Sequence, residues 1–423
     1  MQVTVRGLVT LGTAGPRELW RRRQDLLLRL ATFPMAVASV LWLAYQFWRL
    51  LSAAPPIWKG SWPGAVDLRQ RYGEVHAWFS GKPVYGAIHT ATYPPASYVI
   101  LWPFVGWCDF TTARLVWAAT SVIALAWLIR MLLREAHANT RTERAFIALM
   151  PLAMYATGAT IGNGQLMVHI LPLLIGSALV LHSWPNGWRR NVCVVLLMLA
   201  ALVKPSVAGP FFWIVLFADN GLLPASLTLL GYATLTVAAA APQVARFDVL
   251  LRQWATQAGE LSAVASLDYS HGNVHSWLTG LKLERWNFPA SLLLLAALGV
   301  WVFRHRRHDP WLQLGVTGLV TRFLSYHGWY DDLLLLLPMI ALYRIARVAP
   351  ETGGEGPVSG LLLALTLPMM LAPGGQYLLP NPWLHYWLAV QEMLWLLTLG
   401  FLLWVARLHH RRGAANATRR SAI

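Results

Sequence analysis

Long apolar runs alternate with short polar links along most of the chain. A helix needs about 20 apolar residues to cross a bilayer. The pattern therefore predicts an all-α polytopic membrane protein, a single domain over residues 1–423 with about 12 transmembrane helices. The predicted spans are 33–51, 111–133, 145–161, 166–182, 190–203, 206–217, 225–241, 285–303, 310–325, 333–347, 358–372 and 388–406. Several are shorter than about 20 residues, so we expect broken or partly buried helices among them.

One polar and aromatic stretch, residues 61–95, interrupts this pattern directly after the first span. Within it, apolar residues recur every three or four positions: Leu68, Tyr72, Val75 and Phe79. Polar residues stand off this stripe: Arg69, Arg71, Glu74 and His76. The spacing predicts an amphipathic helix on the membrane surface, with its polar edge toward a cavity. Asp67 lies at the start of this helix, where it is a helix cap, a reactive carboxylate or both.

Composition and charge support a membrane protein. The chain is 57% hydrophobic and 12% charged, whereas soluble domains carry roughly 25% charged residues. Its net charge of +16 lies in short basic clusters beside apolar runs, which is typical of cytoplasmic loops rather than of nucleic-acid binding. The clusters place residues 1–30, 134–144, 183–190, 304–309 and 407–423 in the cytoplasm. We expect an integral protein of a bacterial cytoplasmic membrane.

The exterior side then receives two large loops, 52–92 and 242–284. Residues 93–109 are apolar enough for another span, but counting them would reverse every later segment. Their length and two prolines favour a re-entrant or half-buried piece, so whether they cross the membrane stays open. The exterior links gather the unusual polar residues of the sequence: Asp67, Tyr93, Asn163, Gln165, Lys204, His271, Asn273, His327, Tyr330, Asp331 and Asp332.

These candidates also have purely structural interpretations. Lys204, between two apolar runs, is either functional or reaches to the membrane surface from a helix end. Asn163 and Gln165 either contact a ligand or satisfy the backbone of a broken hairpin. Residues 327–332 either belong to a site or simply begin a helix at the membrane interface.

This set of residues suits sugar transfer from a lipid-linked phosphate on the exterior face. A carboxylate takes the proton of an acceptor hydroxyl as its oxygen attacks the anomeric carbon, and it stabilises an oxocarbenium-like transition state. The departing phosphate needs Lys, Arg or His, its polyprenyl tail needs an apolar slot, and aromatic rings suit sugar faces. The sequence holds no nucleotide-binding motif and no cysteine pattern of a zinc site or disulfide framework.

Short motifs within the exterior segments resemble glycosyltransferase family 87. These polytopic GT-C enzymes include polyprenyl-phosphate-mannose-dependent mannosyltransferases. The first exterior loop carries the order Asp67, Tyr72, Gly81, Val84–Tyr85 and Tyr93–Pro94–Pro95. Later pieces follow in the same order: Gly164–Gln165, Lys204–Pro205, Asn273 with Ser276, and Tyr326–His327 with Tyr330 and Asp331. The match is a scatter of short motifs across most of the chain.

The resemblance implies a GT-C-type fold with amphipathic helices in the first exterior loop, and inverting transfer with Asp67 as the general base. It places Lys204 and His327 at the donor phosphate. Substrate-binding residues would be Tyr93, Asn163, Gln165, His271, Asn273, Tyr330 and Asp331. The run after Tyr326 departs from the family pattern, so the role of Asp331 versus Asp332 stays open. GT-C relatives often pair two acids with a metal, whereas Asp67 has no second acid beside it, so we expect no metal and no cofactor.

The expected function is transfer of a sugar, for example mannose, from a polyprenyl-phosphate donor to an extracytoplasmic glycolipid or glycan. Membrane lipid and these two substrates are the expected partners. Two alternatives stay open. A transporter or flippase would carry paired charges at mid-membrane in broken helices, whereas a lipid-linked glycan ligase or polymerase would carry a large exterior loop rich in Arg and His, with which residues 242–284 are compatible.

Overall fold

The computed structural model describes residues 16–53, 63–268, 271–348 and 354–421, and these residues form helices and connecting turns without a β-strand. Its α-helices are α1 (Pro16–Ser52), α2 (Val66–Phe79), α3 (Pro95–Val105), α4 (Phe110–Glu135), α5 (Arg141–Ala153), α6 (Tyr155–Asn163), α7 (Met167–Ser183), α8 (Trp188–Ala201), α9 (Pro205–Ala208), α10 (Phe212–Phe217), α11 (Leu222–Ala240), α12 (Phe247–Asp268), α13 (Val274–Gly280), α14 (Asn287–Arg304), α15 (Pro310–Leu324), α16 (Leu336–Val348), α17 (Glu355–Met370), α18 (Gly375–Leu378) and α19 (Trp383–Ser421). Three 3₁₀ helices accompany them: η1 (Gly209–Phe211), η2 (Glu284–Trp286) and η3 (Trp329–Leu335).

The all-α prediction is confirmed, and so is the membrane character of several helices. Within the described residues, five segments are long and apolar enough to cross a bilayer: Leu28–Ser52, Phe110–Glu135, Leu222–Ala240, Glu284–Arg304 and Trp383–His409. The pair α6 and α7, bent by 119° at its break, would make a sixth. The expected count of about 12 is not confirmed, because helices such as α16, with 13 residues, reach only about 20 Å against a hydrocarbon core of about 30 Å.

The predicted span 145–161 is interrupted where Met154 leaves the helical conformation, between α5 and α6. A segment from the other end of the chain satisfies the backbone there, since the Ala372 N–H donates to the carbonyl of Ala153 at 2.8 Å. The apolar piece 93–109 forms α3, whose 11 residues are too few to cross the bilayer. The re-entrant or half-buried interpretation of this piece is therefore the one that the structure favours.

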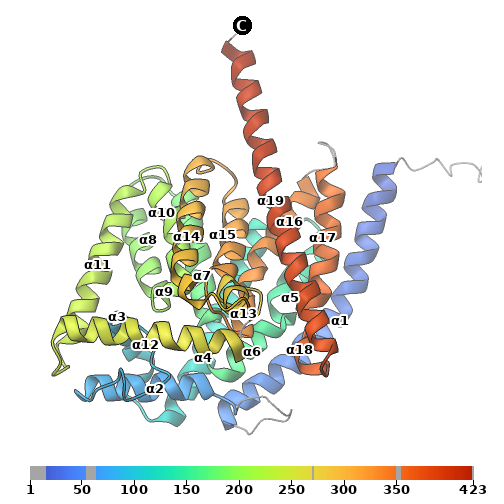
Figure 1. Cartoon of the computed structure of the whole chain (residues 1–423). Helices are drawn as coiled ribbons and strands as arrows, with labels where there is room; N and C mark the ends of the chain where they lie inside the picture. Colours follow the sequence, from blue (N-terminus) through green and yellow to red (C-terminus); the bar gives the residue numbers. More distant parts are fainter. Residues whose placement is uncertain (1–15, 54–62, 269–270, 349–353, 422–423) are drawn as a thin grey trace, which may run out of the picture.

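The two large loops that were predicted to be exterior lie side by side. In Figure 1, α2 (blue) and α12 (yellow) run across the lower part of the molecule, whereas most long helices run from top to bottom. The Trp78 indole of α2 donates to the Ala239 carbonyl at 2.7 Å, and Gln243 Nε2 donates to the Trp78 carbonyl at 2.6 Å. Residues 54–62 and 269–270 of these loops, like residues 1–15 of the basic N-terminus, lie outside the described part of the chain.

The helix predicted in the first loop is present as α2. Of its apolar stripe, Leu68 and Val75 are buried, whereas Phe79 is 39% exposed. Arg71 and Glu74, predicted to face a cavity, are buried as well. They pair with each other, Arg71 Nη2 to Glu74 Oε1 at 2.7 Å, which offsets the desolvation cost that the spacing alone could not reveal.

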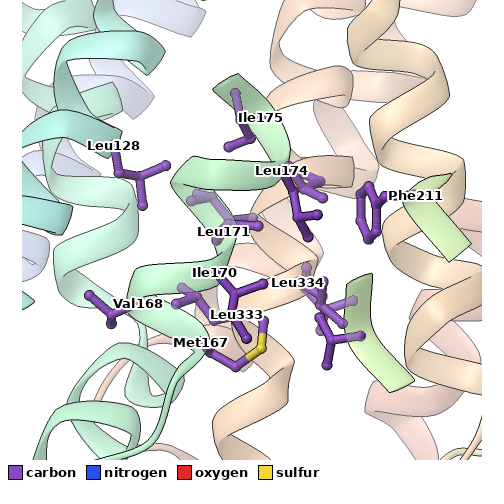
Figure 2. Close-up of a cluster of buried hydrophobic side chains, with 14 of the residues drawn as sticks. Leu128, Met167, Val168, Ile170, Leu171, Leu174, Ile175, Phe211, Leu333 and Leu334 are labelled. Carbon is purple, nitrogen blue, oxygen red and sulfur yellow. The ribbon is translucent and has the colours of Figure 1, made fainter. Parts of the chain in front are cut away.

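A dense apolar core holds the pieces of the site together. Figure 2 shows α7 side chains packed against η3 and α4, with Ile170, Leu171 and Leu174 among them and Leu333 and Leu334 opposite. All five are 1% exposed or less. In a bilayer such packing, rather than exclusion of water, drives association of apolar helices. The core therefore fixes η3, which carries Tyr330, Asp331 and Asp332, against α7.

Candidate functional site

Asp67 is held against the tip of the bent pair α6–α7. The Ala65 N–H, at the start of α2, donates to the Gly162 carbonyl at 2.7 Å. Gly164 adopts a φ of +74°, and a Cβ there would lie 2.4 Å from Cβ of Leu68, so only glycine permits this approach. The Gln165 side chain hydrogen-bonds to Asp67. The predicted association of Asp67 with Gln165 is thus present.

Asp67 does not cap α2. Ala65 occupies the cap position and no side chain accepts a capping hydrogen bond there. The carboxyl is half-buried, and burial raises its pKa from 3.8 to about 6, although Arg71, Gln165 and Lys204 oppose this rise. A carboxyl with a pKa near 6 is ionised at neutral pH and still basic enough to accept a proton, which suits a general base.

Lys204 and Asp331 form a buried ion pair in the electrostatic surroundings of Asp67. Lys204 Nζ lies 2.6 Å from Asp331 Oδ1, and the two side chains are 11% and 2% exposed. Lys204 follows the end of α8 and precedes Pro205, so the chain break directs its amine inward. The amine also lies 5.1 Å from the centre of the Tyr330 ring. Lys204 therefore does not reach to the membrane surface.

His327 completes this cluster from the opposite side of Asp331. Its Nδ1 lies 3.0 Å from Asp331 Oδ2, and its Nε2 lies 2.9 Å from the Thr321 carbonyl oxygen. Both neighbours are hydrogen-bond acceptors, but burial lowers the pKa of His327 despite the opposing effect of Asp331, so a neutral ring that donates to one of them is favoured. Burial alone would raise the pKa of Asp331, but Lys204 and His327 outweigh it and lower the pKa to about 2. Asp331 is thus an ionised acid that contacts Lys204 on one side and the His327 ring on the other.

Sequence reasoning missed Arg71 and Glu74, which lie beside Asp67. The Arg71 guanidinium stacks 4.3 Å from the centre of the Tyr93 ring and donates to the Thr90 carbonyl at 3.1 Å. Burial raises the pKa of Glu74 to about 7, against the opposing effect of Arg71. Their spacing, one turn apart on α2, permits an ion pair but does not indicate that the pair is buried beside Asp67.

Asp67 was expected to lack a second acid nearby, and that expectation is wrong. Glu74 and Asp331 both act on its electrostatic surroundings. Glu74 forms an ion pair with Arg71, and Asp331 forms one with Lys204. Among the described residues, no group of three or more His, Cys, Asp or Glu side chains is arranged to hold a metal ion.

The consecutive acids of η3, Asp331 and Asp332, bind different partners. Asp332 pairs with Arg322 of α15 and accepts from the Tyr155 hydroxyl at 2.5 Å. Successive residues of a 3₁₀ helix lie about 120° apart, so neighbouring side chains point to different sides. Asp331 is therefore the acid that faces Lys204. Arg322 and Tyr155 were not predicted, because both lie inside apolar runs of the sequence.

The remaining candidates divide into two groups. Tyr330 belongs to the cluster, and its carbonyl accepts from the Thr160 hydroxyl at 3.2 Å. Asn163 instead binds a neighbouring helix, because its Oδ1 accepts from Arg49 Nη2 of α1 at 3.3 Å. Asn273 caps α13 by accepting from the Ser276 N–H at 3.0 Å. Asn163 therefore connects α6 to α1, and Asn273 holds the start of α13 in place.

His271 lies on the Arg322 side of η3, where its carbonyl accepts from Arg322 Nη2 at 3.0 Å. The structure thus brings together seven of the predicted residues and leaves three outside their cluster. The seven are Asp67, Tyr93, Gln165, Lys204, His327, Tyr330 and Asp331.

Comparison with known proteins identifies the family. The model of glycosyltransferase family 87 matches residues 91–326, more than half of the 423 residues. The match includes Tyr93, Gln165 and Lys204, whereas Asp67 and Asp331 lie just outside it. No curated protein and no solved structure was found to match. On the strength of the family match, this helical membrane protein belongs to glycosyltransferase family 87.

Proposed function

We propose that this glycosyltransferase moves a sugar, for example mannose, from a polyprenyl-phosphate donor to a glycolipid or glycan acceptor, with inversion at the anomeric carbon. The observation that carries the proposal is that one charge cluster contains both a half-buried basic carboxylate, Asp67, and a buried amine, Lys204, whose ion-pair partner is Asp331. We further propose a GT-C-type fold in a bacterial cytoplasmic membrane, with the site on the exterior face and both termini in the cytoplasm.

In this proposal Asp67 removes the proton from an acceptor hydroxyl while that oxygen forms a bond to the anomeric carbon. The bond from the anomeric carbon to the phosphate oxygen breaks, this oxygen keeps the electron pair, and polyprenyl phosphate leaves. Attack on the face opposite the leaving group inverts the configuration. The negative charge of Asp67 also stabilises the oxocarbenium character of the transition state.

Lys204 would hold the departing phosphate, because an ammonium group can donate to phosphate oxygens while Asp331 retains one of its N–H groups. His327 would hold Asp331, and through it Lys204, in position at the donor phosphate, since both side chains contact the Asp331 carboxylate. Tyr93, stacked under Arg71, offers an aromatic wall to the sugar. Gln165 would keep Asp67 oriented toward the acceptor. In this scheme no metal or cofactor takes part.

The test is release of free polyprenyl phosphate from a panel of polyprenyl-phosphate sugars by purified protein in lipid nanodiscs. We expect release with one sugar, and Asp67→Asn should abolish it while leaving donor binding intact. Wild-type turnover in this variant would remove Asp67 from the role of base. Movement of intact donor across a vesicle membrane without release would instead favour a lipid transporter, and joining of whole glycan chains would favour a ligase or polymerase.

A further inference from the structure

A second polar group lies on the other side of η3 and takes no part in the proposed reaction. Its central residue is Glu392 of α19, the one Asp, Glu, Lys or Arg of the sequence between 383 and 406. This stretch belongs to the candidate span Trp383–His409. A carboxylate inside a span is costly and is a functional-site hypothesis by default.

Glu392 has only neutral hydrogen-bond donors as direct partners in the described part of the chain. The Trp277 indole N–H of α13 donates to Glu392 Oε2 at 3.4 Å, and the Gly272 N–H also contacts the carboxylate. No described Lys, Arg or His side chain forms an ion pair with it. Gly272 has a φ of +65°, and a Cβ there would lie 2.7 Å from Cγ of Glu392. The loop before α13 is therefore fitted closely to this carboxylate.

Two buried N–H donors lie near Glu392. Arg322 Nη1 and Trp395 Nε1 have no hydrogen-bond partner among the described residues, although their side chains are only 1% and 3% exposed. The Arg322 guanidinium lies 5.0 Å from the centre of the Trp395 ring. Trp395 follows Glu392 by one turn of α19, so both lie on the same side of the helix. Buried donors of this kind favour a ligand rich in oxygen atoms.

We propose that Glu392 and Trp277 form a subsite for a neutral, hydroxyl-rich sugar ring of the acceptor, on the Arg322 side of η3. The proposal rests on the proposed function, since it assigns the second substrate of that reaction.

The chemistry of the two side chains fits this ligand. An ionised carboxylate only accepts hydrogen bonds and so suits neighbouring hydroxyl groups. The Trp277 side chain is 39% exposed, which leaves an indole surface for the apolar face of a sugar. A cationic ligand is disfavoured because Arg322 lies within electrostatic reach of Glu392. Arg322 also pairs with Asp332, the neighbour of Asp331, so the subsite adjoins the reaction cluster.

Saturation-transfer NMR on the full-length protein in nanodiscs tests the subsite without turnover. The probes are methyl α-mannopyranoside, methyl α-glucopyranoside and methyl α-galactopyranoside. We expect one of them to bind, and Glu392→Gln to weaken its Kd roughly tenfold or more, because hydrogen bonds to a charged group are lost. Trp277→Ala should weaken it as well. The matched controls Glu284→Gln and Trp286→Ala lie in η2, which follows α13 along the chain, and should bind the probe like the wild type.

Asp67→Asn should retain probe binding, because the subsite is separate from the proposed base. Absence of binding of all three probes to the wild type would overturn the proposal. Unchanged binding by a Glu392→Gln variant with a wild-type unfolding temperature would do the same. If the wild type binds a probe in the expected pattern but releases no polyprenyl phosphate, the proposed reaction fails while the sugar subsite stands.

Discussion

Replacing Asp67 by Asn should abolish transfer and at the same time stabilise the protein at neutral pH. Burial raises the pKa of Asp67 from 3.8 to about 6, so the folded protein disfavours the ionised carboxylate. Two pKa units correspond to an upper limit of about 3 kcal/mol of unfolding free energy. The protonated carboxyl contributes this stability fully below pH 4. The contribution is lost as the pH rises through 6, and it is absent at pH 7. Asn carries no charge and avoids the penalty.

The assay compares unfolding temperatures of wild type and Asp67→Asn between pH 4.5 and 7.5 at one scan rate, because membrane proteins often unfold irreversibly. The variant should melt several degrees higher at pH 7.5, and the difference should shrink toward pH 4.5. Its transfer rate should fall about 10²–10⁴-fold, the usual contribution of a general base. In the wild type, transfer should fall about tenfold from pH 7 to 5 as Asp67 becomes protonated.

Asp109→Asn is a control of opposite sign. Asp109 caps α4 by accepting from the Thr111 and Thr112 N–H groups at 2.8 and 3.0 Å. These hydrogen bonds lower the pKa of Asp109, so its substitution should destabilise the protein at neutral pH. The reasoning is refuted if Asp67→Asn melts below the wild type at pH 7.5, or if its advantage is the same at both ends of the pH range.

Three further predictions concern the same cluster. Lys204→Met should raise the pKa of Asp67 and move the acidic limb of the pH–rate profile to higher pH. Asp331→Asn should lower this pKa and move the limb to lower pH. If both variants shift the limb in the same direction, the proposed cluster is contradicted. Gly164→Ala should destabilise the protein by about 1–3 kcal/mol through backbone strain, whereas Gly73→Ala, exposed and with open space around it, should not destabilise it. Chelators should leave transfer unchanged, and inhibition reversed by magnesium or manganese would contradict a metal-free reaction.

Much of the fold was predictable because apolar runs long enough to span a bilayer are unambiguous in sequence. Residues 111–133 and 225–241 correspond closely to α4 and α11. The interruption at Met154 was not predictable, because the backbone groups freed there are satisfied by Ala372, more than two hundred residues away. The number of helices that fully cross the membrane stays a prediction for the same reason, since packing against neighbours permits short helices.

The site was partly predictable because charge asymmetry assigns the polar links to one side of the membrane. That rule grouped Asp67 with Lys204 and Asp331, which the structure places together. It did not identify Arg71 or Arg322, whose burial depends on partners that spacing does not specify. Nor did it separate Asn273, a helix cap, from residues that face the cluster.

The opposed contacts of Asp331 and Asp332 have a mechanical consequence. One acid is drawn toward Lys204 and the next toward Arg322, so the short helix that bears them is restrained against rotation about its own axis. A single-residue insertion or deletion before this dipeptide would move one acid into the position of the other and leave either Lys204 or Arg322 without its carboxylate. Length variation just upstream of Asp331 should therefore be tolerated far less well than amino-acid substitution there.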